Sequence, residues 1–278
     1  MAAYRKQYNR KRKRSRLGPL FQFLCGIAVI VALTMGATVF FKVENIEVLG
    51  NQRYTQEEVI QATGIQIGDN LFHLNKYAIY DQVGQSLPYI ETIQIRRGLP
   101  NTIRVSVTEW NAVAEILPNE TPEQLVWESD SEPEEKLEPA TDSWLISVGG
   151  KLLEQANENG NVVEVSGITL LTPVAGTQMV APQQEQIQEN ALLALLGELE
   201  RQGMLSGVEQ IDLKSTVIEL KYLGRYHVKM PLDCDFEYKL QALRAAVSER
   251  EKALGTNISG SFDLTQKNFM AVYSPAEH

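Results

Sequence analysis

The chain has 278 residues, of which 44% are hydrophobic and 22% are charged, and its formal net charge is −9. This composition is ordinary for a globular protein and excludes a wholly disordered or collagen-like chain. A mean hydropathy of −0.20 excludes a protein with many membrane spans but leaves room for one. Two cysteines cannot build a disulfide framework or a four-cysteine zinc site, and the length allows about two domains.

The positive charge is concentrated at the N-terminus. Residues 1–16 contain eight Lys and Arg and no acidic residue, so the other 262 residues carry a net charge of −17. A basic tail on an acidic body indicates that the two ends occupy different environments. Nucleic-acid binding is one interpretation of such a tail, and the segment that follows it favours a membrane instead.

Residues 17–41 contain no charged side chain. As a helix, the 22 residues of 20–41 would be about 33 Å long, enough to cross a hydrocarbon core of about 30 Å. The alternative is a cleaved signal peptide, whose apolar part of about 7–15 residues ends at a small-residue cleavage site. This segment is longer and ends in Val39, Phe40 and Phe41. We therefore expect a transmembrane helix at 20–41, a cytoplasmic tail at 1–19 and extracytoplasmic domains after it.

Residues 43–111 predict a small domain with the element order β-α-α-β-β. Thr55 and Glu58 form a capping box before the first helix, which Gly64 ends. Asn75 caps the second helix, which ends at Pro88. Turns are expected at Gly50 and Gly68 because glycine tolerates a positive φ. The predicted strands are 43–50, 89–97 and 102–108, and the residues expected on the inner face of the second helix are Tyr77, Tyr80, Val83 and Leu87.

Residues 112–278 predict a strand-rich α+β domain with two helices, at 183–202 and 236–254. The first helix carries an apolar stripe that favours core packing over partner binding. The strands are expected at 208–213, 217–220, 226–230, 259–264 and 269–273, and the stripe consists of Ile187, Leu192, Leu195, Leu196 and Leu199.

A proline-rich, acidic segment at 118–143 interrupts this second domain. It contains four prolines, one lysine and many acidic residues, and such a run cannot bury enough apolar surface to order itself. We expect an exposed loop, and Trp127 leaves an acidic docking site as the alternative.

The sequence lacks the motifs of nucleotide-binding loops, hydrolase elbows and zinc proteases. His73 and His227 have no second ligand at helical or strand spacing, and Asp233 and Asp235 would disfavour the thiolate of Cys234. We expect no catalytic residues, no metal site and no cofactor.

The β-α-α-β-β order behind an N-terminal anchor resembles a POTRA domain. Its turns and strands resemble those of the bacterial cell-division family FtsQ/DivIB, and weaker similarity continues through the second domain. The residues that carry the resemblance are Ile46–Val48, Gly50-Asn51, Gly64, 68–72, Leu74, Pro88, Ile90, 98–100 and 105–109, followed by 144–153, 171–176, 238–240 and 261–264.

The resemblance implies a single-pass protein of the cell membrane at the division septum. It implies a non-enzymatic divisome scaffold that binds FtsL-like and FtsB/DivIC-like partners and no nucleic acid. Two other functions stay open, namely an exported envelope enzyme and a POTRA-based chaperone or translocation module.

The final strand is the predicted partner-binding site, where a partner segment would add to the sheet by β-augmentation. Tyr273 offers an aromatic anchor, and alternation places Met270 and Val272 on the face opposite Ala271 and Tyr273. Phe262 and Leu264 on the preceding strand are expected to support this strand from the core. The alternative is an ordinary hairpin edge without a partner.

Overall fold

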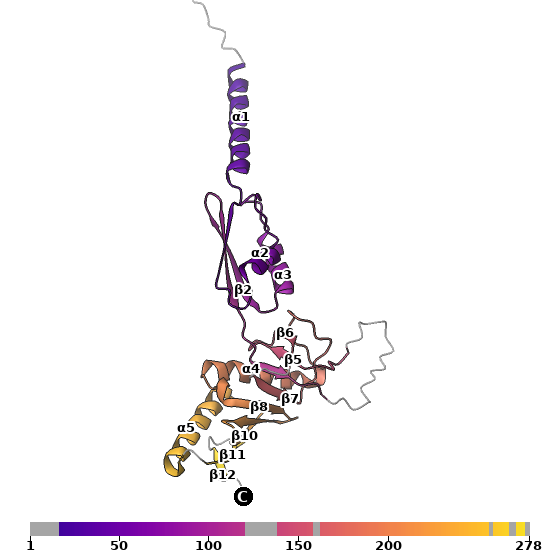
Figure 1. The fold of residues 1–278 in the computed structure, drawn as a ribbon, viewed down its shortest axis with the longest axis vertical. Helices are drawn as coiled ribbons and strands as arrows, with labels where there is room; N and C mark the ends of the chain where they lie inside the picture. The colour runs from indigo at the N-terminus through magenta and orange to yellow at the C-terminus, as the bar shows by residue number, and fades with distance from the viewer. Residues whose placement is uncertain (1–16, 120–137, 158–161, 256–257, 267–270, 276–278) are drawn as a thin grey trace, which may run out of the picture.

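The structure is a computed structural model, and it describes residues 17–119, 138–157, 162–255, 258–266 and 271–275. Figure 1 shows three parts in a row along the long axis of the molecule. A single helix is followed by a small domain with a three-stranded sheet and then by a larger domain built on a second sheet. The predicted α+β class is confirmed for the two domains.

The first part is α1 (Leu17–Phe40), whose described side chains are largely apolar and exposed. Within the residues that the structure describes, no helix combines the length and apolar character that a membrane span requires. The transmembrane segment at 20–41 coincides with this helix and stays a prediction.

The small domain has the predicted order of elements. It contains β1 (Asn45–Leu49), α2 (Gln56–Thr63), α3 (Lys76–Ser86), β2 (Ile90–Gly98) and β3 (Thr102–Glu109). The strand order is β1-β3-β2, with β3 parallel to β1 and antiparallel to β2. Alternation along β3 buries Ile103, Val105 and Val107 under the helices, as the sequence pattern indicates.

Local signals place both helix starts correctly. Thr55 and Glu58 make the reciprocal bonds of a capping box, and Gly64 ends α2 with a left-handed φ of 66°. The Asn75 side chain accepts a hydrogen bond from the first turn of α3. The backbone φ is also positive at the predicted turns, +89° at Gly50 and +97° at Gly68.

The predicted inner face of α3 is partly wrong. Tyr77 is 81% exposed, and Ile79 and Val83 are the buried residues. Successive residues turn by about 100° around a helix, so Tyr77 lies about 200° from Ile79 and points away from the sheet. The error is confined to Tyr77, because Val83 and Leu87 belong to the domain core and Tyr80 packs against it.

The large domain is built on a nine-stranded sheet with the order β12-β11-β10-β9-β8-β7-β4-β5-β6. Three pairings are parallel, namely β4–β7, β7–β8 and β10–β11, and the others are antiparallel. The strands are β4 (Ala114–Ile116), β5 (Trp144–Ile146), β6 (Leu152–Gln155), β7 (Val163–Ser166), β8 (Val208–Leu213), β9 (Val217–Tyr222), β10 (Tyr226–Pro231), β11 (Gly260–Asp263) and β12 (Val272–Pro275).

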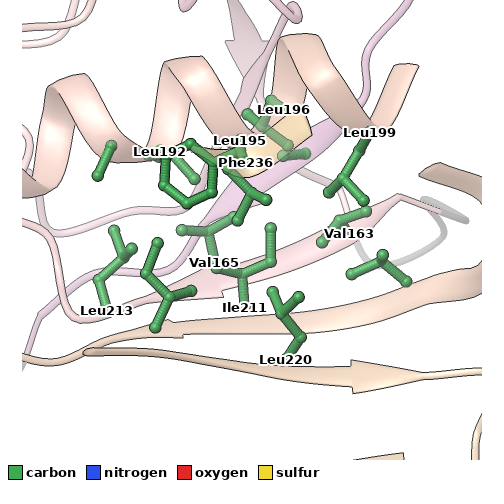
Figure 2. Close-up of a cluster of buried hydrophobic side chains, with 14 of the residues drawn as sticks. Val163, Val165, Leu192, Leu195, Leu196, Leu199, Ile211, Leu213, Leu220 and Phe236 are labelled. Carbon is green, nitrogen blue, oxygen red and sulfur yellow. The ribbon is translucent and has the colours of Figure 1, made fainter. Parts of the chain in front are cut away.

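Two long helices pack against this sheet, α4 (Gln186–Arg201) and α5 (Phe236–Leu254), and short helical turns η1 (Gln183–Glu185) and η2 (Leu205–Gly207) flank α4. Figure 2 shows the leucines of α4 facing valine, isoleucine and leucine side chains of the strands. Leu192, Leu195, Leu196 and Leu199 are fully buried, which confirms the predicted stripe, but Ile187 in the first turn of α4 is exposed.

Two predicted segments cannot be compared with the structure. Most of the acidic segment 118–143, including Trp127, and residues 1–16 of the basic tail lie outside the described residues. The domain limits 43–111 and 112–278 stay predictions, although β3 ends at Glu109 and β4 begins at Ala114.

A polar cluster joins the two domains. The Glu154 carboxylate on β6 accepts a 2.7 Å hydrogen bond from the Tyr89 hydroxyl and bonds of 2.9 and 3.1 Å from the Arg53 guanidinium. The Arg53 guanidinium carbon also lies 3.8 Å from the centroid of the Tyr89 ring. Lys151 adds a 3.0 Å bond from its ammonium group to the Ile90 carbonyl. We call Arg53, Tyr89, Lys151 and Glu154 the interdomain clamp.

Burial makes the Tyr89 hydroxyl a dependable donor in the clamp. The Tyr89 side chain is buried, and this burial raises the pKa of the phenol, with a further rise from its hydrogen bond to Glu154. The neutral donor therefore persists through the physiological pH range and holds the carboxylate in place.

We expect Glu154→Ala to loosen the orientation of the two domains. The Arg53–Glu154 pair is half-exposed, so their coupling measured in a double-mutant cycle should be only about 0.2–1 kcal/mol. The distance distribution between spin labels on α3 and α5 should nevertheless broaden. Glu47→Ala is the matched control, because Glu47 pairs with Arg104 within one domain. Equal widths in both variants would contradict a clamping role.

Candidate partner-binding site

The candidate site is the outer edge of β12, the last strand of the nine-stranded sheet. This strand pairs with β11 in antiparallel register, with Phe262 opposite Tyr273 and Asp263 opposite Val272. No described strand pairs with the other side of β12. Figure 1 places this edge at the end of the molecule farthest from α1.

The final strand extends two residues beyond its predicted end at Tyr273. The described strand is Val272–Pro275. Pro275 can occupy this position because a strand edge needs no ladder donor there, and the described strand ends at this residue. Residues 267–270, including Met270, lie outside the described residues.

The bonds of β11 determine which backbone groups of β12 face outward. On the side of β10, the Gly260 N–H donates to the Arg225 carbonyl over 3.2 Å and the Leu264 N–H to the Lys229 carbonyl over 2.7 Å. Because these groups alternate in direction along a strand, those of residues 261 and 263 point to β12. They lie opposite Ser274 and Val272, whose backbone groups therefore face β11.

The backbone groups of Tyr273 consequently point away from β11, at the free edge of the sheet. The same alternation, continued one residue before the strand, gives this direction to the groups of Ala271. Pro275 adds only a carbonyl, because proline has no N–H group. The edge thus offers donors and acceptors at alternate residues, which is the pattern that an added strand bonds to.

The Tyr273 side chain packs onto its own domain. Its ring centroid lies 5.2 Å from that of Phe262, and its hydroxyl donates a 2.9 Å hydrogen bond to the Ser259 carbonyl. The Arg250 guanidinium of α5 lies 5.0 Å from the ring centroid. Tyr273 therefore holds β12 on the sheet, with its ring half-buried at the edge.

Gly260 allows Tyr273 to take this position. A Cβ atom at residue 260 would lie 2.5 Å from the Ser274 carbonyl oxygen and 2.6 Å from the Tyr273 ring. Sequence reasoning missed Gly260 and Arg250, although a glycine inside a predicted strand is a known sign of a close approach.

The predicted site residues thus divide into three groups. Phe262 and Leu264 are each 1% exposed and belong to the core, as their supporting role requires. Ala271 and Tyr273 are half-buried and pack against that core. Val272 is exposed on the opposite face, which agrees with the predicted alternation.

Contacts from α5 hold the C-terminal end of β11. The Lys239 ammonium group donates to the carbonyls of Leu264 and Gln266, over 2.6 and 3.0 Å. The Asp263 carboxylate accepts bonds from the hydroxyl and N–H of Thr265, which lower the pKa of this carboxyl group. These bonds hold the residues that directly follow β11.

Groups that could perform other chemistry lie apart. Among the described residues, no three potential metal ligands come together. The pKa of the Cys234 thiol is raised to about 11, mainly by burial, and Asp233 and Asp235 add to the effect. The prediction of a disfavoured thiolate is confirmed, but its main cause is burial and not the flanking charges.

The chain thus combines a βααββ domain with an open sheet whose outermost described strand, β12, is paired on one side only. Comparison with known proteins specifies its class. Residues 41–110 match the model of the POTRA domain, FtsQ-type, and the small domain is a POTRA domain of this type.

Relatives with known names agree with this class. The chain is 36% identical over 91 residues to a cell division protein FtsQ of Geotalea daltonii, covering 33% of this chain and 31% of that protein. It is 33% identical over 105 residues to a cell division protein DivIB of Clostridium botulinum, covering 37% and 40%. For a DivIB of Clostridium acetobutylicum the identity is 30% over 155 residues, covering 55% and 53%.

The chain thus spans about a third to a half of the length of these relatives. Together with the FtsQ-type POTRA domain, they support its assignment to the FtsQ/DivIB family of cell-division proteins.

We expect Gly260→Ala to separate β12 from β11. The added methyl group must displace Tyr273 or Ser274, and overpacking of this kind costs about 1–3 kcal/mol. Amide hydrogen exchange at residues 271–275 should accelerate. Gly197→Ala is the control, because a methyl group on that face of α4 meets no atom within 4 Å. Unchanged exchange in Gly260→Ala would show that the edge tolerates the methyl group.

Proposed function

We propose that the chain is a non-enzymatic scaffold of the bacterial division machinery, anchored in the cell membrane, which binds FtsL-like and FtsB/DivIC-like partners. The observation that carries the proposal is the outward direction of the backbone groups of Ala271 and Tyr273 at the terminal strand. The FtsQ-type POTRA domain supports a place in the division machinery. The identity of the partners rests on the resemblance to the FtsQ/DivIB family.

Binding would occur by β-augmentation at β12. An extended partner segment would bond to the outward groups of Ala271 and Tyr273, while Val272 contacts it from one face of the sheet. Main-chain bonding needs no nucleophile or acid–base pair, so this function requires no catalytic group.

Membrane anchoring would place both domains outside the cytoplasm at the septum. The uncharged segment 20–41 follows a strongly basic tail, which favours a cytoplasmic N-terminus. The exposed apolar side chains of α1 also support burial in lipid, because none of the described ones packs into either domain core.

The edge is tested by Ala271→Pro in the full chain. This change removes an outward N–H but leaves the groups that face β11, so partner binding should weaken at least about tenfold, the equivalent of about 1.4 kcal/mol. Ala271→Gly keeps the N–H group and should bind normally. Co-purification and titration with the FtsB/DivIC-like partner measure both variants, and unfolding curves confirm that both fold.

Tyr273→Ala should also weaken binding, by about 1–3 kcal/mol, because β12 loses the ring that holds it against Phe262. Full binding by both Ala271→Pro and Tyr273→Ala would exclude β12 as the site.

The topology is tested by protease treatment of spheroplasts. We expect external protease to digest residues after 43 and to leave the basic tail protected, because positive charge is retained in the cytoplasm. Mass spectrometry of the mature chain should find an intact N-terminus. A mature protein that starts near residue 38 would instead identify a signal peptide.

A further inference from the structure

Four exposed apolar side chains surround the junction between α1 and the POTRA domain. They come from three segments: the end of α1, the turn before α3 and the turn between β2 and β3. Phe40 is 68% exposed, Ile67 67%, Phe72 50% and Leu99 63%. We call these four residues the apolar collar.

Backbone hydrogen bonds tie the first turn of the collar to the chain just after α1. Val43 donates its N–H to the Asp69 carbonyl over 2.8 Å, and Gly68 donates to the Val43 carbonyl over 2.8 Å. Leu71 donates to the Phe41 carbonyl over 3.0 Å. Ile67 and Phe72 are therefore held beside the end of the helix.

The second turn is held in the same way. The Asn101 carbonyl accepts hydrogen bonds from the N–H groups of Glu44 and Asn45, over 2.8 and 3.2 Å. Leu99 in this turn consequently lies close to the same junction. The position of the collar relative to the end of α1 is thus built into the domain.

Aromatic contacts make the collar continuous with the helix. The ring centroids of Phe40 and Phe41 are 5.4 Å apart, and those of Phe41 and Phe72 are 5.2 Å apart, both nearly perpendicular. An apolar path therefore runs from α1 onto the surface of the domain.

Charged side chains of both signs lie near the collar. Lys42 is exposed, and the Arg97 guanidinium lies 5.4 Å from the Phe72 ring centroid while its Nε donates to the Leu71 carbonyl. Two carboxylates also lie there: Glu44 accepts a hydrogen bond from the Asn101 side chain, and Asp69 accepts one from the Gln66 N–H. Basic side chains next to apolar ones are typical of the lipid headgroup region.

We propose that the apolar collar inserts into the interfacial layer of the membrane that holds α1, so that the POTRA domain is seated on the lipid surface. The proposal rests on the anchoring proposed above. The occupant is phospholipid, because the collar continues the apolar surface of α1 onto the domain. Seating at the collar would restrict tilting about the junction and keep β12, at the opposite end in Figure 1, away from the membrane.

The test uses the full chain reconstituted in vesicles of phosphatidylethanolamine and phosphatidylglycerol. Tryptophan is introduced by Leu99→Trp and, in a second variant, by Ile67→Trp, and the emission of the parent protein is subtracted. Acyl chains brominated near the headgroup should quench most of the added fluorescence and shift its maximum to shorter wavelength. Leu49→Trp is the matched control, because Leu49 is 53% exposed at the other end of the domain and should not be quenched.

The possible outcomes distinguish the collar proposal from the anchoring proposal. If the chain resists extraction by alkaline carbonate but neither collar variant is quenched more than Leu49→Trp, the collar proposal is wrong and the anchor stands. If carbonate extracts the chain, both proposals fail. Shifted emission in detergent that depends on protein concentration would indicate a second copy as the occupant and would also overturn the proposal. Unfolding curves identify any variant that does not fold, in which case the other collar variant decides.

Discussion

The carboxylate of Glu154 is the contact on which the arrangement of the two domains depends. It receives hydrogen bonds from Tyr89 and Arg53, which lie in the POTRA domain, while Glu154 itself lies in a strand of the other sheet. Each bond alone is modest because the ion pair is half-exposed. The Tyr89 ring adds a cation–π contact with the Arg53 guanidinium, which stacks on it. Solvent does not weaken this contact, because the ring is buried. With this contact in place, α1 and β12 lie at opposite ends of one elongated body.

The free edge results from the way the large sheet is built. β11 follows α5 and pairs in parallel with β10, and β12 adds to the other side of β11. A terminal strand of four residues makes few bonds, and its retention depends on side chains. The Tyr273 side chain holds the strand by packing on Phe262 and donating a hydrogen bond to the Ser259 carbonyl. Gly260 leaves room for the Tyr273 ring, because it has no Cβ. The Tyr273 ring attaches β12 to the domain and leaves the outward backbone groups of β12 uncovered.

Much of the local structure could be predicted from the sequence, because helix caps and glycine stops act within a few residues. The capping box at Thr55 and the bounds of α5 are examples. The strand β7 was missed although Val163 and Val165 alternate, because a strand of four residues gives a weak pattern. Its parallel pairings join segments distant in sequence, which periodicity does not encode. The packing of Tyr273 also escaped prediction, since it depends on Gly260 across the strand pair.

Backbone direction, more than side-chain identity, makes the edge of β12 a suitable binding surface. Because β11 uses the groups of Val272 and Ser274, a partner strand is limited to those of Ala271 and Tyr273 and to the carbonyl of Pro275. A register shift by one residue would leave these groups unpaired, so a partner must align with this alternation. The fold would therefore set the register of the proposed binding, and exposed side chains such as Val272 would discriminate between partners. Such an edge would select a partner by a short extended segment, as the proposed scaffold function requires.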